Sequence, residues 1–356
     1  MTAHIIWDAR KARDFGIGRY VTSLLAALAR RGTFRLSAIA FPEDRELLPE
    51  SVDLLPCRAP HYSLREVISV GRILSGTPHD LFHAPHYVTP AAPFGGRPMV
   101  VTVHDLMHLS RPEHASPAKR LYARTMIGRA LDGAARVIAV SEATRDEIGA
   151  FRSPQLSKVR VVPNGVDDRF LGEIPAADRE RVRKTHGLDT PYVLFLGNDK
   201  PHKNLARLVQ SFEMLQPSHR LVLAGGATAR TRGVHALGRV PETDLPALLA
   251  EATALALPSL AEGFGLPVLE AQAAGTPVLC SRRGGLAEAA GEAAVFVDPE
   301  SVDSIAEGLT RLLGDAALRG RLSAEGRAHA RRFTWDAAAE ATAAVYEEAL
   351  GETAET

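Results

Sequence analysis

Residues 254–274, with the sequence ALALPSLAEGFGLPVLEAQAA, join a short apolar run to a helix through a glycine-rich turn. We expect a strand at Ala254–Leu257 and a helix at Pro267–Ala274, because proline is favoured at the start of a helix. Glu262 precedes this helix and Glu270 lies about one turn inside it. A strand–turn–helix unit of this kind is typical of a parallel sheet covered by helices.

The same alternation of strands and helices extends in both directions along the chain. The other expected strands are His4–Trp7, Arg35–Ala40, Asp80–His83, Met99–His104, Val137–Val140, Val159–Val162, Tyr192–Leu196, Arg220–Ala224, Pro277–Cys280 and Ala294–Val297. A length of 356 residues suits two domains rather than one. The sequence therefore predicts an α/β chain of two doubly wound, Rossmann-like domains facing a cleft, divided near 167/168 after a Pro-Asn-Gly turn.

Composition narrows the functional classes. Lys and Arg number 42 and Asp and Glu number 42, and this zero balance argues against a protein that binds nucleic acid through bulk charge. No apolar run approaches the roughly 20 residues of a membrane span, and the N-terminus does not resemble a signal peptide. The two cysteines, Cys57 and Cys280, are too few for a disulfide framework, so a cytoplasmic location is expected.

Two motifs suggest anion binding. Gly16 and Gly18 follow the first strand and open a helix, where backbone N–H groups can approach a phosphate. A dinucleotide fingerprint is disfavoured because Val21 replaces its third glycine, and an ordinary turn is the alternative. Lys203, in Pro201–Asn204, is expected on the first turn of a helix, where it could pair with a phosphate; the alternative is a solvated surface lysine.

Carboxylates and a histidine complete the candidate set. Glu262 and Glu270 could hold two parts of one polyol ligand, the alternative being two unrelated acids near a helix start. His104 is expected at the carboxyl end of a strand, where ligands bind in α/β sheets; a capped loop histidine is the alternative. No Asp-x-Asp sequence is present to chelate a metal between phosphates, so no metal cofactor is expected. A zinc site among the six histidines from His79 to His114 is a weaker alternative.

Together these segments resemble the retaining sugar-nucleotide glycosyltransferases of glycosyltransferase family four, which have the two-lobed GT-B fold. Within that family the chain looks most like bacterial mannosyltransferases of surface polysaccharide synthesis. The segments that carry the resemblance are Gly16–Tyr20, Asp80–His83, Val101–Asp105, Ala139–Glu142, Val162–Val166, Pro201–Asn204, Leu223–Gly226, Glu262–Glu270 and Phe333–Trp335.

The resemblance implies a role for each candidate residue. Glu270 would hold the nucleotide ribose, Glu262 the donor sugar, and Lys203 the diphosphate, while His104 would lie near the donor sugar and the acceptor. The implied catalytic residues are His104, Glu262 and Lys203, and the implied donor-binding residues are Gly16, Gly18, Asn198, Lys203, Glu262, Gly263, Phe264, Gly265, Leu266 and Glu270. One departure is that Asn198 stands where many members carry a second phosphate-binding cation, which Lys200 could replace.

The resemblance also implies an organisation and an activity. Residues 1–167 with the returning helix 336–356 would form the acceptor-binding domain, and residues 168–335 the nucleotide-sugar domain. The activity would be metal-independent, retaining transfer of a hexose, with mannose from GDP-mannose as the first candidate, to a glycan or lipid-linked glycan. UDP-glucose and UDP-N-acetylglucosamine stay open as donors. The alternatives are a sugar-nucleotide epimerase of the same fold, a glycosidase and a non-catalytic sugar-binding protein.

A helix rich in basic residues suggests peripheral contact with a membrane. Lys119, Arg120, Arg124 and Arg129 recur along the helix that follows Pro117. Such a surface could contact anionic lipid at the inner face of a membrane, and an ordinary solvated helix is the alternative.

Overall fold

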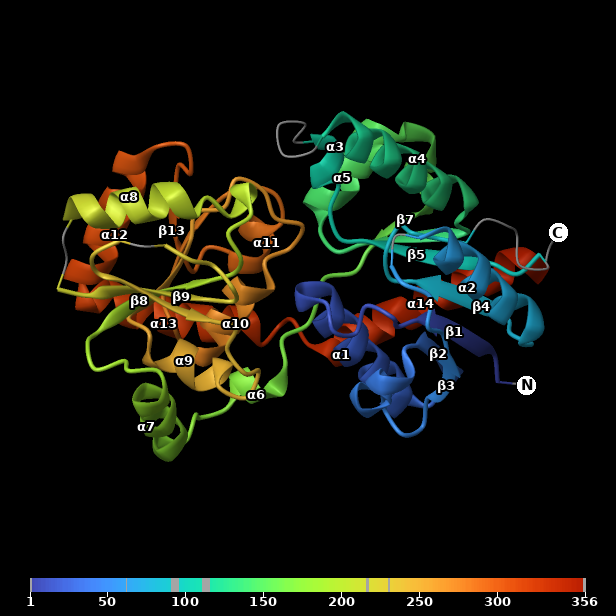
Figure 1. Ribbon diagram of the computed structural model, residues 1–356, viewed down its shortest axis with the longest axis horizontal. Coiled ribbons are helices and arrows are strands. Elements are labelled where there is room, and N and C mark those ends of the chain that lie inside the picture. Colours follow the sequence, from blue (N-terminus) through green and yellow to red (C-terminus); the bar gives the residue numbers. More distant parts are fainter. Residues whose placement is uncertain are drawn as a thin grey trace. The chain divides into compact units, whose positions relative to one another are not determined.

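The computed structural model describes residues 2–61, 63–90, 96–110, 116–215, 218–229 and 231–354. The chain forms two compact units (Figure 1): unit 1 comprises Met1–Gly165 and Thr334–Thr356, and unit 2 comprises Val166–Phe333. Each division lies two residues before the expected one, at 165/166 instead of 167/168 and at 333/334 instead of 335/336.

Within its described residues, unit 1 is built on a seven-stranded parallel sheet in the order β3-β2-β1-β4-β5-β6-β7. Its strands are β1 His4–Asp8, β2 Arg35–Ala40, β3 Asp53–Pro56, β4 Leu81–Ala84, β5 Met99–Val103, β6 Arg136–Ala139 and β7 Val159–Val161. Its helices are α1 Phe15–Arg31, α2 Leu64–Gly76, α3 Met107–Ser110, α4 Pro117–Gly133, α5 Glu142–Phe151 and α14 Trp335–Ala354. A core of apolar side chains joins α2, α4 and α5 to one face of the sheet, and α1 packs with α14.

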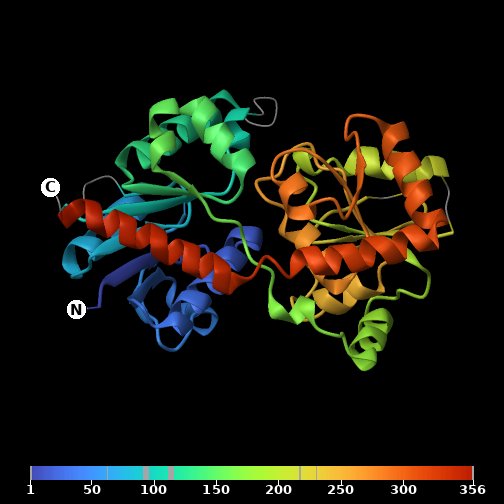
Figure 2. The ribbon, with the colours of Figure 1, turned by 180° about the vertical axis from the view of Figure 1, so that it is seen from behind.

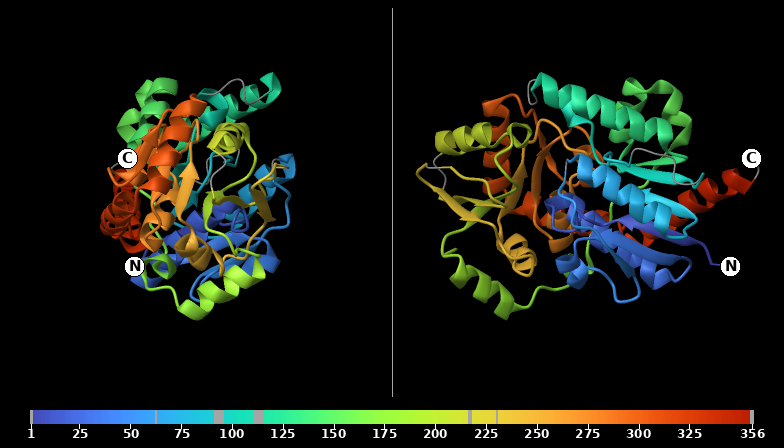
Figure 3. Two further views of the ribbon diagram at one scale, coloured as in Figure 1. Left: turned by 90° about the vertical axis from the view of Figure 1, so that its left-hand side faces the viewer. Right: turned by 45° about the vertical axis from the view of Figure 1, so that its right-hand side comes forward.

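Unit 2, over its described residues, is built on a six-stranded parallel sheet in the order β10-β9-β8-β11-β12-β13. Its strands are β8 Tyr192–Leu196, β9 Arg220–Ala224, β10 Val234–Gly238, β11 Ala254–Leu257, β12 Val278–Ser281 and β13 Val295–Val297. Its helices are α6 Asp168–Leu171, α7 Ala176–Thr185, α8 Leu205–Leu215, α9 Leu245–Glu251, α10 Leu266–Ala274, α11 Leu286–Ala290, α12 Val302–Gly314 and α13 Ala316–Ala330. Helices α8 and α12 cover one face, and α9, α10 and α13 the other (Figures 1 and 3).

The doubly wound fold is as expected, and the central strands explain why it could be predicted. All five residues of β8, YVLFL, are buried because helices cover both faces of the sheet. The prediction missed β3 and β10, each of which is one of the two edge strands of its sheet. Both are largely half-exposed, so they lack the continuous apolar run that marks a central strand.

The strand order places a switch point in each sheet. Adjacent strands β1 and β4 in unit 1, and β8 and β11 in unit 2, continue into connections that run in opposite directions across the sheet. In parallel α/β sheets, ligands bind beyond the carboxyl ends of the strands at such a point. A ligand site is therefore expected among the residues that follow these four strands.

The C-terminal helix α14 returns to unit 1, as the resemblance implied (Figure 2). It packs against α1, β5 and β6, and Glu348 forms ion pairs with Arg136 (2.9 Å) and Arg160 (2.7 Å). A Cβ atom at Gly165 would overlap the backbone of Trp335, so glycine lets the two chain segments meet at the start of this helix. None of the described helices is both long and apolar enough to span a membrane.

Candidate functional site

Lys203 lies beyond the end of β8, in a 3-10 turn formed by Pro201–Lys203. Its expected position on the first turn of α8 is wrong, because Asn204 separates the two elements with a left-handed backbone (φ 59°). The Asn204 side chain is 5% exposed and donates hydrogen bonds to the carbonyl oxygens of Pro258 (2.8 Å) and Pro299 (2.6 Å). This asparagine therefore fixes the turn carrying Lys203 to the segments that follow β11 and β13.

Glu262, beyond the end of β11, forms an ion pair with Lys203. Nζ of Lys203 lies 2.6 Å from Oε1 of Glu262, and the two side chains are only 16% and 11% exposed. The Ser259 hydroxyl donates to the same carboxylate oxygen over 2.9 Å. The stem of Lys203 passes over Gly197, where a Cβ atom would lie 3.6 Å from Cδ. Two predicted residues thus meet at the switch point of unit 2.

The start of α10 adds backbone donors beside this pair. Gly265 caps the helix at φ 112°, a conformation that favours glycine, and Leu266 begins it. The first N–H groups of a helix have no intrahelical acceptor, and the helix dipole places partial positive charge there. Phe264 is buried against the Phe333 ring (6.0 Å between centroids), which fixes the turn between Gly263 and Leu266. Glu270 lies inside this helix and is 1% exposed.

Two glycines that the sequence analysis did not select support this turn. The Gly285 N–H donates to the carbonyl of Glu262 over 2.9 Å. A Cβ at Gly284 would overlap the Glu262 carbonyl, and one at Gly285 would overlap the carbonyl of Gly263. The signal that could have identified them is a glycine pair in the loop after β12, at the same edge of the sheet as Glu262.

The Asn198 side chain bonds within its own loop, where its oxygen accepts the N–H of Lys200 over 3.3 Å. Lys200 is exposed.

In unit 1, Gly18 has a packing reason to be glycine, because a Cβ atom there would overlap the carbonyl of Ala12. At Gly16 a Cβ atom would meet nothing within 4 Å.

His104 follows β5 and is held as a neutral base. Its Nε2 lies 3.0 Å from the Pro85 carbonyl oxygen, and because a carbonyl can only accept, Nε2 carries the proton. Burial, together with the nearby His86 and Lys11, lowers the pKa of His104 to about 4, although the hydrogen bond to Pro85 opposes this. The remaining Nδ1 lone pair can accept a hydrogen bond from a hydroxyl group.

A buried charge cluster lies beyond β1, and the sequence analysis missed it. Arg10 donates to Asp8 (Nε to Oδ1, 2.8 Å) and to Glu66 (Nη2 to Oε1, 2.9 Å). All three residues are about 2% exposed or less. Although burial alone would raise it, the pKa of Asp8 is held far below its usual range by Arg10 and His86. The Asp-x-Arg spacing directly after the first strand was the available signal.

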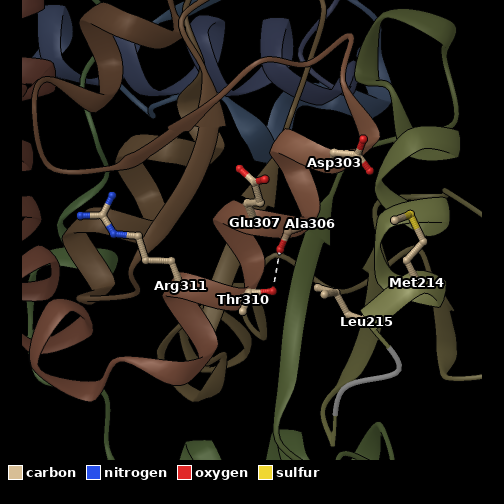
Figure 4. Close-up of a pocket in the computed structure, with 7 residues that line it drawn as sticks. All are labelled: Met214, Leu215, Asp303, Ala306, Glu307, Thr310 and Arg311. Carbon is tan, nitrogen blue, oxygen red and sulfur yellow. Dashed lines mark hydrogen bonds between the residues drawn. The ribbon is translucent and has the colours of Figure 1, made fainter.

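Among the described residues, no three His, Cys, Asp or Glu residues are placed to hold a metal ion. Of the histidines considered for zinc, His114 and the His108 side chain lie outside the described parts, as does the Lys119 side chain. A surface pocket of about 500 Å³ between α8 and α12 is lined by residues that the sequence analysis did not select (Figure 4): Met214, Leu215, Asp303, Ala306, Glu307, Thr310 and Arg311.

The buried histidines of unit 1 predict acid sensitivity. Burial lowers the pKa of His83 to about 3 and that of His104 to about 4, from an ordinary value of 6.5. The unfolded chain therefore binds more protons below pH 6.5, and each group removes up to about 1.4 kcal/mol of stability per pH unit, down to about pH 3 and pH 4 respectively. Urea unfolding of wild type and His83→Gln between pH 7 and pH 5 should give a shallower pH dependence for the variant. An equal pH dependence of the unfolding free energy in both proteins would contradict the lowered pKa of His83.

Comparison with known proteins identifies the family. Residues 16–170 match the family described as Glycosyltransferase Family 4, and residues 177–329 match the family described as Glycosyl transferases group 1. An O-antigen chain mannosyltransferase B of Escherichia coli is 30% identical over 242 residues, which cover 63% of this chain and 64% of the relative. The alignment thus spans less than two thirds of that relative's length.

Solved structures show the same fold. Sucrose-phosphate synthase from Thermosynechococcus elongatus superimposes with a TM-score of 0.79 at 21% identity, covering 98% of this chain and 99% of that one. The Anabaena protein Alr3699/HepE, solved in complex with UDP and glucose, gives a TM-score of 0.77 at 20% identity, covering 97% and 99%. With two Rossmann-like units and matches to both family descriptions, the chain belongs to glycosyltransferase family four and has the GT-B fold.

Proposed function

We propose that this protein transfers a hexose from a nucleoside-diphosphate sugar to a hydroxyl group of a glycan. The observation that carries the proposal is the Lys203–Glu262 pair at the switch point of unit 2, beside the start of α10. A cation, a carboxylate and helix N–H groups at one strand edge provide donors for phosphate and acceptors for sugar hydroxyls. The mannosyltransferase name of the E. coli relative supports the same class of reaction.

Unit 2 would bind the donor. The Lys203 ammonium has three N–H donors, and its bond to Glu262 uses one of them, so it can also bind a phosphate oxygen. The N–H groups near Phe264, Gly265 and Leu266 would share the negative charge, and Glu270 would accept hydrogen bonds from the ribose hydroxyls. Glu262, already oriented by Ser259, would accept a hydrogen bond from a hydroxyl of the donor sugar.

The chemistry would need no metal ion. The bond between the anomeric carbon and the diphosphate oxygen breaks, and the charge that develops on the leaving diphosphate is stabilised by Lys203 and the N–H groups. A bond forms between the anomeric carbon and the acceptor oxygen, and the acceptor's proton passes to the departing phosphate. Attack from the same face retains the anomeric configuration. His104 would accept a hydrogen bond from a sugar hydroxyl through Nδ1 and so orient the reacting groups.

Mannose from GDP-mannose is our first candidate donor, on the strength of the relative's name. UDP-glucose is the second, because the Anabaena structure holds UDP and glucose. The acceptor would be a growing or lipid-linked glycan, bound by unit 1. Leu121 and Tyr122 on α4 are 67% and 41% exposed beside the basic residues of that helix, which suits a peripheral membrane contact. Both cysteines are free and buried, which suits the cytoplasm.

A donor panel tests the reaction. The chain is incubated in EDTA with GDP-mannose, UDP-glucose or UDP-N-acetylglucosamine, with and without a lipid-linked glycan. We expect diphosphate release only with acceptor, fastest with GDP-mannose, and a product that keeps the anomeric configuration by NMR. An altered donor without acceptor would indicate an epimerase instead, and binding without turnover a sugar-binding protein. Loss of activity in EDTA would refute the metal-free mechanism.

Variants test the donor site. Lys203→Ala should lower the transfer rate by about 100-fold or more, because a preorganised charge opposite the leaving group is lost. Glu270→Ala should mainly raise the KM for the donor. The matched controls are Lys184→Ala and Glu292→Gln, which remove exposed charges elsewhere in unit 2. Near-normal kinetics in Lys203→Ala and Glu270→Ala would rule out this site.

A further inference from the structure

We propose that a buried chain of side chains, Tyr346–His83–Thr102–Tyr20, positions His104 from the C-terminal helix α14. The inference rests on the proposed function in assigning His104 to the reaction, but the chain itself is read from the structure. Its members come from four elements that are far apart in the sequence: α14, β4, β5 and α1. They are positioning residues, because each acts through its neighbour and ultimately on the His104 ring.

Tyr20 is the member that contacts His104. Its hydroxyl lies 2.8 Å from Oγ1 of Thr102, and its ring meets the His104 ring edge-on, with 4.8 Å between centroids and an angle of 87°. Thr102 lies in β5, and His104 follows it by two residues, directly after the end of the strand. The hydrogen bond to Thr102 thus fixes the aromatic ring that flanks His104, while Pro85 holds its Nε2.

His83 connects Thr102 to the C-terminal helix. Its Nε2 lies 2.8 Å from Oγ1 of Thr102, and its Nδ1 lies 2.6 Å from the hydroxyl of Tyr346. Both rings are fully buried. A polar group with no access to water must find its hydrogen bonds within the protein, so these contacts allow few alternative positions. None of the chemistry proposed above uses His83, and this arrangement gives it a role.

Helix α14 contributes to this set of buried side chains at two points. Tyr346 meets His83, and Trp335 at the first turn lies against Tyr20, with 6.2 Å between ring centroids. Trp335 also packs on Gly165, where the chain leaves unit 1. The final helix, although remote in sequence, therefore supports the side chain that flanks His104. Small structural changes in α14 should therefore alter the position of the Tyr20 ring.

The test measures the His104 ring directly, without substrate. The groups that face it and influence its charge are His83 from β4, His86 from the segment after β4, Lys11 from the segment before α1 and Tyr20 from α1. Asp105 lies in the same loop, where it accepts the N–H of Met107, and Glu147 from α5 accepts the N–H of Leu106. NMR of histidine-labelled protein gives the tautomer and pKa of His104, whose signal is assigned by its loss in His104→Gln.

The buried chain of side chains Tyr346–His83–Thr102–Tyr20 is called the relay below. The relay variants are Tyr20→Phe, Thr102→Val and Tyr346→Phe, and each removes one hydroxyl group while nearly preserving the shape of the side chain. We expect each to mix the His104 tautomers and to raise its pKa by roughly half a unit or more, because water gains access to a less restrained ring. Thr102→Ser, which keeps the hydroxyl, should restore the wild-type signal. Tyr192→Phe is the matched control, because it removes a buried tyrosine hydroxyl that donates to the Leu248 carbonyl (2.6 Å) in unit 2.

An unchanged His104 signal in all three folded relay variants would overturn the proposal, as would an equal change in Tyr192→Phe. A kinetic arm adds the link to the reaction: the relay variants should lower kcat severalfold with the donor KM unchanged, and should have no further effect in a His104→Ala background. A further loss in that background would show that the relay does not act through His104. If wild type transfers no sugar at all, the proposed function fails while the NMR result still decides the relay.

Discussion

The ion pair between Lys203 and Glu262 is the interaction on which the site in unit 2 depends. It joins the segments that follow β8 and β11, the two strands from which the sheet is wound in opposite directions. Asn204 and the glycines at 284 and 285 fix the backbone segments that carry Lys203 and Glu262, so the two side chains are held close to each other. A lysine held in this way would lose little further freedom on binding the proposed diphosphate, and such preorganisation would favour both affinity and catalysis.

Unit 1 applies the same physical rule with neutral groups. Its candidate site residue, His104, is kept uncharged by burial and is held by a carbonyl on one side and an aromatic ring on the other. A neutral imidazole adds no positive charge and can accept a hydrogen bond from a hydroxyl group, whereas the charge for a phosphate would come from Lys203 in unit 2. The burial that lowers the pKa of His104 and of His83 is expected to lower the tolerance of this unit to acid.

The sequence predicted the central strands closely, because β8, β9 and β11 are buried on both faces and read as unbroken apolar runs. It missed β3 and β10, because none of their residues is buried and the continuous apolar run is absent. Lys203 and Glu262 could be selected from their motifs, but their pairing across 59 residues could not be deduced from spacing. The turn before α8 was mistaken for helix because a left-handed asparagine leaves little trace in a hydrophobic pattern. The contact of His83 with Tyr346 spans 263 residues and needed the fold.

The central claim is that Lys203 recognises a diphosphate, and calorimetric binding of GDP, GMP, UDP and UMP to wild type and Lys203→Ala tests it most directly. A charge-assisted hydrogen bond to phosphate contributes about 1.5–3 kcal/mol, so one diphosphate should bind wild type at least about tenfold more tightly than its monophosphate. The variant should lose this difference while keeping the monophosphate affinity. Equal binding of mono- and diphosphates to wild type, or a preference that survives in the variant, would contradict the account.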